Sequence, residues 1–148
     1  LMDPYASLSE AATYFSERLR TAPWDDASQD DKLKALKMAT RAIDRLNFAG
    51  YKHDAAQEFQ FPRGDDTVVP QDVKDACCEL AITFLDDVDA DMEVENLSNS
   101  QQGIGDAKTS RDTSYVQLHI RAGIPSIKAW SLLTPYLDDP RNVDVSRG

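Results

Sequence analysis

Between two helical patterns the chain reads Leu46-Asn47-Phe48-Ala49-Gly50-Tyr51-Lys52 and then, after four residues, Gln57-Glu58-Phe59-Gln60-Phe61-Pro62-Arg63. We call residues 46–63 the aromatic loop, because Phe and Tyr side chains gather in it. Gly50 permits a positive φ, and Pro62 biases the backbone of Phe61 toward an extended conformation. Arg63 supplies a planar guanidinium with five donors. The pattern predicts a loop that caps the core, with Arg63 hydrogen-bonded to nearby backbone or to an acidic side chain. The alternative is a loop that docks a partner.

Upstream of the aromatic loop, two helices are predicted. The first begins at Ser7, because Glu10 stands three residues later at capping-box spacing. Pro23 stops its continuation, and Trp24 is expected to cover the bundle. The second begins near Ser28. Their apolar stripes read Leu8, Ala12, Phe15 and Leu19 in the first helix, and Leu33, Leu36, Thr40, Ile43 and either Leu46 or Asn47 in the second.

Downstream of the loop, two more helices are predicted. One follows Pro70, and its apolar face is wide enough for a central helix packed on more than one side. The last opens at Pro125 and should bend or end near Thr134, because Pro135 lacks an N–H. The apolar positions are Val73, Ala76, Cys77, Leu80, Phe84 and Val88 in the third helix, and Ile127, Trp130, Leu133 and Leu137 in the last.

The predicted fold class is therefore mainly α, a four-helix bundle-like domain over residues 1–137. A long irregular loop over residues 96–124 precedes the last helix, and an extended C-terminal tail covers residues 138–148. Within the loop, apolar and polar residues alternate from Tyr115 to Ile120, which predicts a short extended stretch.

Composition bounds the function. The chain has 148 residues and a net charge of −10, with a dense acidic run over residues 86–95. This excess of acidic residues argues against a general nucleic-acid-binding protein, because such proteins usually present a basic patch. No segment approaches the roughly 20 apolar residues of a membrane span, and no signal segment is expected. The only cysteines, Cys77 and Cys78, are adjacent, so a disulfide framework is excluded and a reducing compartment fits best.

Tests for chemical sites fail. A calcium loop that starts at Asp87 would put Met92 where glycine is needed and Ser98 where the bidentate glutamate belongs. His53 and His119 have no partners at zinc-ligand spacing. We therefore expect no enzyme, no catalytic residue, no metal and no cofactor.

The chain also resembles a known family. The residues that carry the resemblance are Tyr14-Phe15, Arg18, Trp24, Ala42-Ile43-Asp44, Phe48-Ala49-Gly50-Tyr51-Lys52 and the string Gln57-x-Phe59-x-Phe61-Pro62-Arg63. They resemble small tailed-phage proteins, the head-to-tail connectors or adaptors, which are often labelled DnaT-like single-stranded-DNA-binding proteins. The resemblance spans residues 6–137. It implies a virion protein in a ring of twelve identical copies under the portal, made in the host cytoplasm, that joins capsid to tail or nozzle proteins and lets genomic DNA pass.

Candidate contact residues follow from this interpretation. The candidate portal interface consists of Tyr136, Leu137, Arg141, Val143, Val145 and Arg147. The candidate neighbour or channel loop consists of Gln101, Ile104, Lys108 and Arg111. The candidate acidic surface consists of Asp86, Asp87, Asp89, Asp91, Glu93 and Glu95. Because like charges repel at long range, the isolated protein is expected to be monomeric or weakly associated. The alternative function is a single-stranded-DNA-binding protein of phage replication, which would use Trp24, Tyr51 and the lysines of the second helix.

Overall fold

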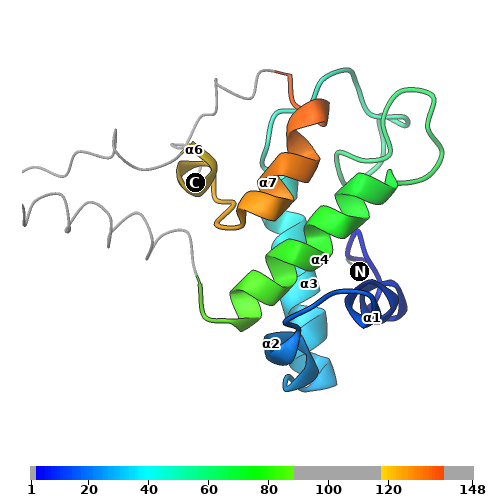
Figure 1. Ribbon diagram of the computed structural model, residues 1–148. Coiled ribbons are helices and arrows are strands. Elements are labelled where there is room, and N and C mark those ends of the chain that lie inside the picture. Colours follow the sequence, from blue (N-terminus) through cyan, green and yellow to red (C-terminus); the bar gives the residue numbers. More distant parts are fainter. Residues whose placement is uncertain (1–2, 89–117, 139–148) are drawn as a thin grey trace, which may run out of the picture.

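The computed structural model describes residues 3–88 and 118–138 (Figure 1). Within these residues the protein is mainly helical, which confirms the predicted fold class. The helices are α1 (Leu8–Ser16), α2 (Ala22–Asp25), α3 (Gln29–Asp44), α4 (Gln71–Leu85), α6 (Leu118–Arg121) and α7 (Ile127–Leu133), followed by the 3-10 turn η2 (Thr134–Tyr136). In these two ranges the only β-type pairings are the isolated bridges Phe48–Leu137 and Lys52–Arg63.

Helix α4 lies at the centre of the domain (Figure 1). It packs mainly against α3 and α7, while α1 and α2 contact it near its other faces. The predicted central position of this helix is confirmed. Its wide apolar face explains the arrangement, because the face supplies buried side chains to several neighbours at once. The buried residues of α4 are Val73, Ala76, Cys77, Cys78, Glu79, Leu80, Ala81 and Ile82.

Helix α1 begins where the sequence predicts, but it ends early. The Ser7 hydroxyl accepts the N–H of Glu10, and the Glu10 side chain accepts the N–H of Ser7, so the capping box is formed. The helix stops at Ser16, and Leu19 therefore leaves the predicted stripe and is 81% exposed. Ala11, rather than Ala12, is the alanine that faces the core.

A short helix, α2, was not expected from the sequence. Pro23 lies in its first turn, where proline's missing N–H costs nothing, so this proline starts a helix instead of only ending one. The helix places the Trp24 ring inside the core, 4.8 Å from the ring centre of Phe15. The prediction that Trp24 covers the bundle is confirmed, and the Lys32 ammonium lies 5.2 Å over its ring.

The C-terminal part contains one correction. Leu118–Arg121 forms helix α6, so the extended stretch predicted through Ile120 is wrong for these residues. Alternating apolar residues in so short a run fit either structure, and His119 and Ile120 are both buried in the helix. Helix α7 ends at Leu133 and continues as a 3-10 turn through Pro135, as predicted. The apolar spacing predicts that Ile127 is buried, but its side chain is 61% exposed.

Among the residues of known position, no helix is long and apolar enough to cross a membrane.

Candidate functional site

The aromatic loop is held by one arginine. Arg63 Nε donates to the carbonyl of Ala49 at 2.9 Å, and Nη2 donates to the carbonyls of Phe48 at 3.3 Å and Gly50 at 2.7 Å. Nη1 reaches the backbone carbonyl of Gln60 at 3.1 Å and its side-chain oxygen at 2.8 Å. The guanidinium thus satisfies carbonyls on both arms of the loop, as expected for Arg63.

The three phenylalanines of the aromatic loop pack into the domain, whereas Tyr51 is exposed. Phe61 is 4% exposed, and its ring centre lies 4.6 Å from Phe48, 5.9 Å from Tyr5 and 6.0 Å from Tyr136. Phe59 is half-buried against Tyr5. Gln57 donates to the carbonyls of Phe59 and Pro62, which closes the turn from within. Three parts of the chain therefore meet at Phe61: the N-terminal segment, the aromatic loop and η2.

A buried hydroxyl joins the same loop to α3. The Tyr5 hydroxyl donates to Asp44 at 2.5 Å, and the same Asp44 oxygen accepts the N–H of Gln60 at 2.7 Å. Burial, together with the Asp44 carboxylate, raises the pKa of Tyr5 above its ordinary value. The hydroxyl therefore stays protonated and remains a donor.

We expect Arg63→Lys to lower the free energy of unfolding by about 1–3 kcal/mol, because a lysine cannot serve carbonyls on both arms and leaves some without a partner. Urea unfolding measures the change. A matched Lys52→Arg variant, also in the loop, should be close to neutral. Equal stabilities of Arg63→Lys and the parent protein would contradict the structural role.

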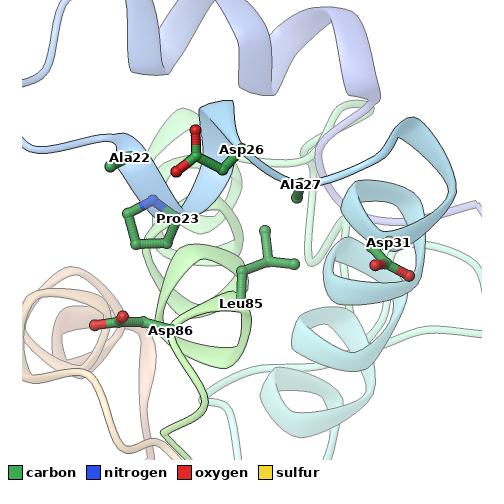
Figure 2. A pocket seen from close by; sticks show the side chains of 7 residues that line it. All are labelled: Ala22, Pro23, Asp26, Ala27, Asp31, Leu85 and Asp86. Carbon is green, nitrogen blue, oxygen red and sulfur yellow. The ribbon is translucent and has the colours of Figure 1, made fainter.

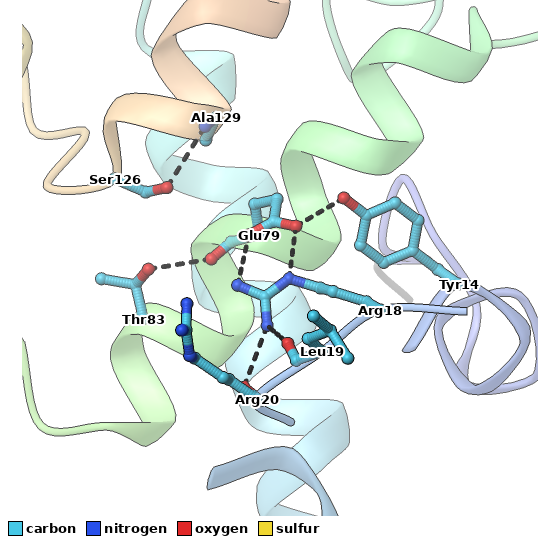
Figure 3. Close-up of polar contacts among 8 residues, drawn as sticks. All are labelled: Tyr14, Arg18, Leu19, Arg20, Glu79, Thr83, Ser126 and Ala129. Carbon is cyan, nitrogen blue, oxygen red and sulfur yellow. Dashed lines mark hydrogen bonds and ion pairs between the residues drawn. The ribbon is translucent and has the colours of Figure 1, made fainter. Parts of the chain in front are cut away.

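A second polar cluster sits where α1 meets α4 (Figure 3). The Glu79 carboxylate, with a side chain 4% exposed, accepts Arg18 Nε at 2.8 Å and Nη2 at 3.1 Å. The Tyr14 hydroxyl donates to the same carboxylate at 2.5 Å. Burial and the Glu79 acceptor raise the pKa of Tyr14 above its ordinary value. A buried carboxylate is thus fully paired, which is the condition under which a buried charge is tolerated.

The third nitrogen of the Arg18 guanidinium, Nη1, binds the turn that follows α1, which we call the 18–20 turn. Arg18 Nη1 donates to the carbonyls of Leu19 at 2.8 Å and Arg20 at 3.0 Å. Arg20 has a φ of 61°, a left-handed conformation that is uncommon for residues other than glycine. Beside the turn lies an open cleft of about 460 Å³, lined also by Tyr14, Glu17 and Lys128.

A second cleft, the acidic cleft, lies between α2, the start of α3 and the end of α4 (Figure 2). Its volume is about 450 Å³. It is lined by the apolar residues Ala22, Pro23, Ala27 and Leu85 and by the carboxylates of Asp26, Asp31 and Asp86. In the ranges 3–88 and 118–138, no group of His, Cys, Asp or Glu is arranged to hold a metal ion, and that includes these carboxylates.

Comparison with models of known protein families gives a match over most of the chain. Residues 2–138 match the model of the family described as "Putative DnaT-like ssDNA binding protein". The chain belongs to this family. No curated protein and no solved structure matches the chain. The DnaT-like match covers the aromatic loop, the 18–20 turn and the acidic cleft together.

Of the candidate contact residues of this DnaT-like chain, some are exposed, some are buried or half-buried, and the rest lie outside the described residues. Asp86 and Asp87 are exposed at the end of α4, while the remaining residues of the candidate acidic surface lie outside the described residues. Leu137 is only 7% exposed and pairs with Phe48, so it belongs to the core rather than to a portal interface. Tyr136 is half-buried, and its hydroxyl donates to Asp72. The other residues proposed for the portal interface and for the neighbour loop, namely Arg141, Val143, Val145, Arg147, Gln101, Ile104, Lys108 and Arg111, lie outside the described residues.

Sequence reasoning missed both the Arg18–Glu79 pair and the exposed 18–20 turn. One signal was present: Glu79 interrupts the apolar face of α4 between Ala76 and Leu80, and a carboxylate at such a position needs a partner. The partner itself stands 61 residues away in the sequence, and no local pattern points to it.

Proposed function

We propose that this DnaT-like protein is a non-enzymatic structural subunit of a tailed-phage virion. In this role it is a head-to-tail connector, or adaptor, at the head-tail junction. Identical copies, twelve by the family resemblance, form a ring that binds the portal on one side and tail or nozzle proteins on the other. Genomic DNA passes through the ring without sequence-specific binding. The protein is synthesised in the host cytoplasm and incorporated into the virion during assembly.

The observation that supports this proposal is the position of Trp24. Single-stranded DNA is bound by aromatic rings that stack on bases along a basic groove. Trp24 is 4% exposed and covered by Lys32, so its ring is not free to stack on a base. The overall charge of −10 is also unfavourable for binding phosphates. For a channel wall the same charge is favourable, because it keeps the DNA backbone from adhering.

A second candidate function is single-stranded-DNA binding in phage replication. The description of the matched family favours this candidate over the connector. Tyr51, 70% exposed, is a ring that could stack on a base, and α3 carries the cations Lys37 and Arg41 on its outer side. Lys34 on the same helix is paired with Asp30.

A titration with a labelled single-stranded oligonucleotide at two salt concentrations separates the candidates. For the connector we expect no saturable binding at physiological salt. For a single-strand binder, the logarithm of the binding constant should fall linearly with the logarithm of the salt concentration, by about 0.7 per phosphate contact. Loss of such binding in Tyr51→Ala, with retention in the exposed control Val68→Ala, would establish the second candidate and overturn the first.

Removal of residues 139–148 tests the portal contact directly. Leu137 is the last buried residue that the structure describes, and the N–H of Asp138 donates to the carbonyl of Asn47. Both residues remain in the truncated protein, so the thermal midpoint of the free protein should hardly change. Binding to purified portal should be abolished, because the tail is the proposed contact. Portal binding by the truncated protein at the affinity of the full chain would rule out this assignment.

A further inference from the structure

We propose that the 18–20 turn of one copy docks into the acidic cleft of a second copy of the chain, with Leu19 entering the cleft and Arg20 meeting its carboxylates. The inference rests on the proposed function only for the number of copies in the ring. The contact itself follows from two surfaces that the structure describes.

The turn is built to present Leu19. This side chain is 81% exposed, more than any other large apolar side chain that the structure describes. It is nevertheless held in place, because Arg18 binds the carbonyls of both Leu19 and Arg20 and is itself anchored on buried Glu79 (Figure 3). A left-handed residue held by a paired buried charge is the kind of local strain that is found at functional positions. A backbone that is already held in this way loses little further conformational freedom when a partner covers the turn.

The acidic cleft has the complementary composition. Figure 2 shows Leu85 and Ala27 pointing into it, with carboxylates of Asp26, Asp31 and Asp86 around them. An apolar floor with an acidic rim suits an occupant that carries one apolar side chain flanked by cations.

Within the described residues, the cations beside Leu19 and the carboxylates of the cleft form no salt bridge. Arg20 and Lys128 line the space beside the turn together with one carboxylate, Glu17, and neither cation forms a salt bridge with another described residue. Asp26, Asp31 and Asp86 form none either within residues 3–88 and 118–138. Complementary potentials of this kind select the partner and its orientation.

The two surfaces also determine the symmetry. Turn and cleft are different patches on one chain, so a copy can donate its turn to one neighbour and receive the turn of another. Such a heterologous contact closes into a ring when the rotation between copies divides a full circle. The same chemistry would let a strongly acidic chain associate, because each contact sets cations of one copy against carboxylates of the next.

Site-directed disulfide trapping tests the contact on the isolated protein. Leu19→Cys and Ala27→Cys are prepared as separate variants, mixed and mildly oxidised. The native Cys77 and Cys78 are buried, and burial raises the pKa of both thiols, so they should stay inert. The mixed dimer should form roughly ten-fold faster than with the control pair Val68→Cys plus Ala27→Cys, because docking raises the effective thiol concentration.

Several outcomes would overturn the proposal. The first is an equal rate of disulfide formation for the Leu19→Cys/Ala27→Cys pair and the Val68→Cys/Ala27→Cys control pair. The second is a Leu19→Cys variant that forms a disulfide with itself faster than with Ala27→Cys. A charge exchange gives an independent reading by sedimentation: Arg20→Glu and Asp86→Arg should each reduce association of the folded protein, and an equimolar mixture of the two should restore it. No restoration would also count against the contact. Portal is absent from these experiments, so a failure of portal binding alone would affect the proposed function and leave this contact standing.

Discussion

Replacement of Phe61 by alanine is expected to lower the free energy of unfolding by about 3–5 kcal/mol, the usual cost of deleting a fully buried aromatic ring. The ring is 4% exposed and touches Phe48, Tyr5 and Tyr136, which come from three separate parts of the chain. The cavity cannot close easily, because each of these neighbours is held by its own backbone contacts. Urea unfolding followed by circular dichroism gives the number.

The control for Phe61→Ala is Val68→Ala. Val68 lies beyond the same loop and is 69% exposed, so its truncation should change stability by less than about 0.5 kcal/mol. Phe61→Ala could instead keep the parent's unfolding curve and lose assembly with portal. That result would show that the aromatic loop is an interface and would contradict its architectural role.

Arg18→Met is expected to destabilise the protein by about 3–5 kcal/mol, because it leaves the carboxylate of Glu79 buried without its countercharge. The Arg18 side chain is 20% exposed and that of Glu79 is 4% exposed, so water cannot replace the lost partner well. Tyr14 alone would remain to donate to the carboxylate. The 18–20 turn should also lose its fixed shape, since Arg18 holds both of its carbonyls.

Two comparisons make the Arg18 result decisive. The double variant Arg18→Met/Glu79→Leu removes both charges and should recover most of the lost stability. The ion pair between Lys74 and Glu10 is more exposed, with side chains 26% and 43% accessible, and Lys74→Met should cost only about 0.2–1 kcal/mol. If Arg18→Met costs no more than Lys74→Met, the buried pair does not stabilise the fold.

Local signals in the sequence predicted the four longer helices, α1, α3, α4 and α7, but not the two short ones, α2 and α6. The caps at Ser7 and Ser28 were located correctly, because a cap is set by residues within one turn of the helix. Pro135 likewise marked the end of α7 through its own missing N–H. The wide apolar face that follows Pro70 was enough to identify the central helix, because a helix buried on several sides carries apolar residues around most of its circumference.

The features that the sequence did not predict depend on distant residues. The apolar spacing alone could not show that α1 stops at Ser16, and this end is what exposes Leu19. The sequence places Leu137 on the apolar side of the last helix and also offers it as a candidate portal contact. In the structure it is buried by pairing with Phe48, a contact between residues far apart in sequence. The acidic cleft likewise combines α2, α3 and α4, and no local motif encodes it.

The end of the described core has a mechanical consequence. The N–H of Ala49 donates to the carbonyl of Tyr136, and the N–H of Asp138 donates to that of Asn47. A force applied to the chain after Asp138 would therefore be transmitted through these two hydrogen bonds to the aromatic loop before it could unwind α7. Arg63 donates to the carbonyls of Phe48 and Ala49, so its hydrogen bonds would resist the force next. Tension on the tail would thus be shared with the guanidinium and with the packed ring of Phe61, so this joint should yield only when the core itself opens.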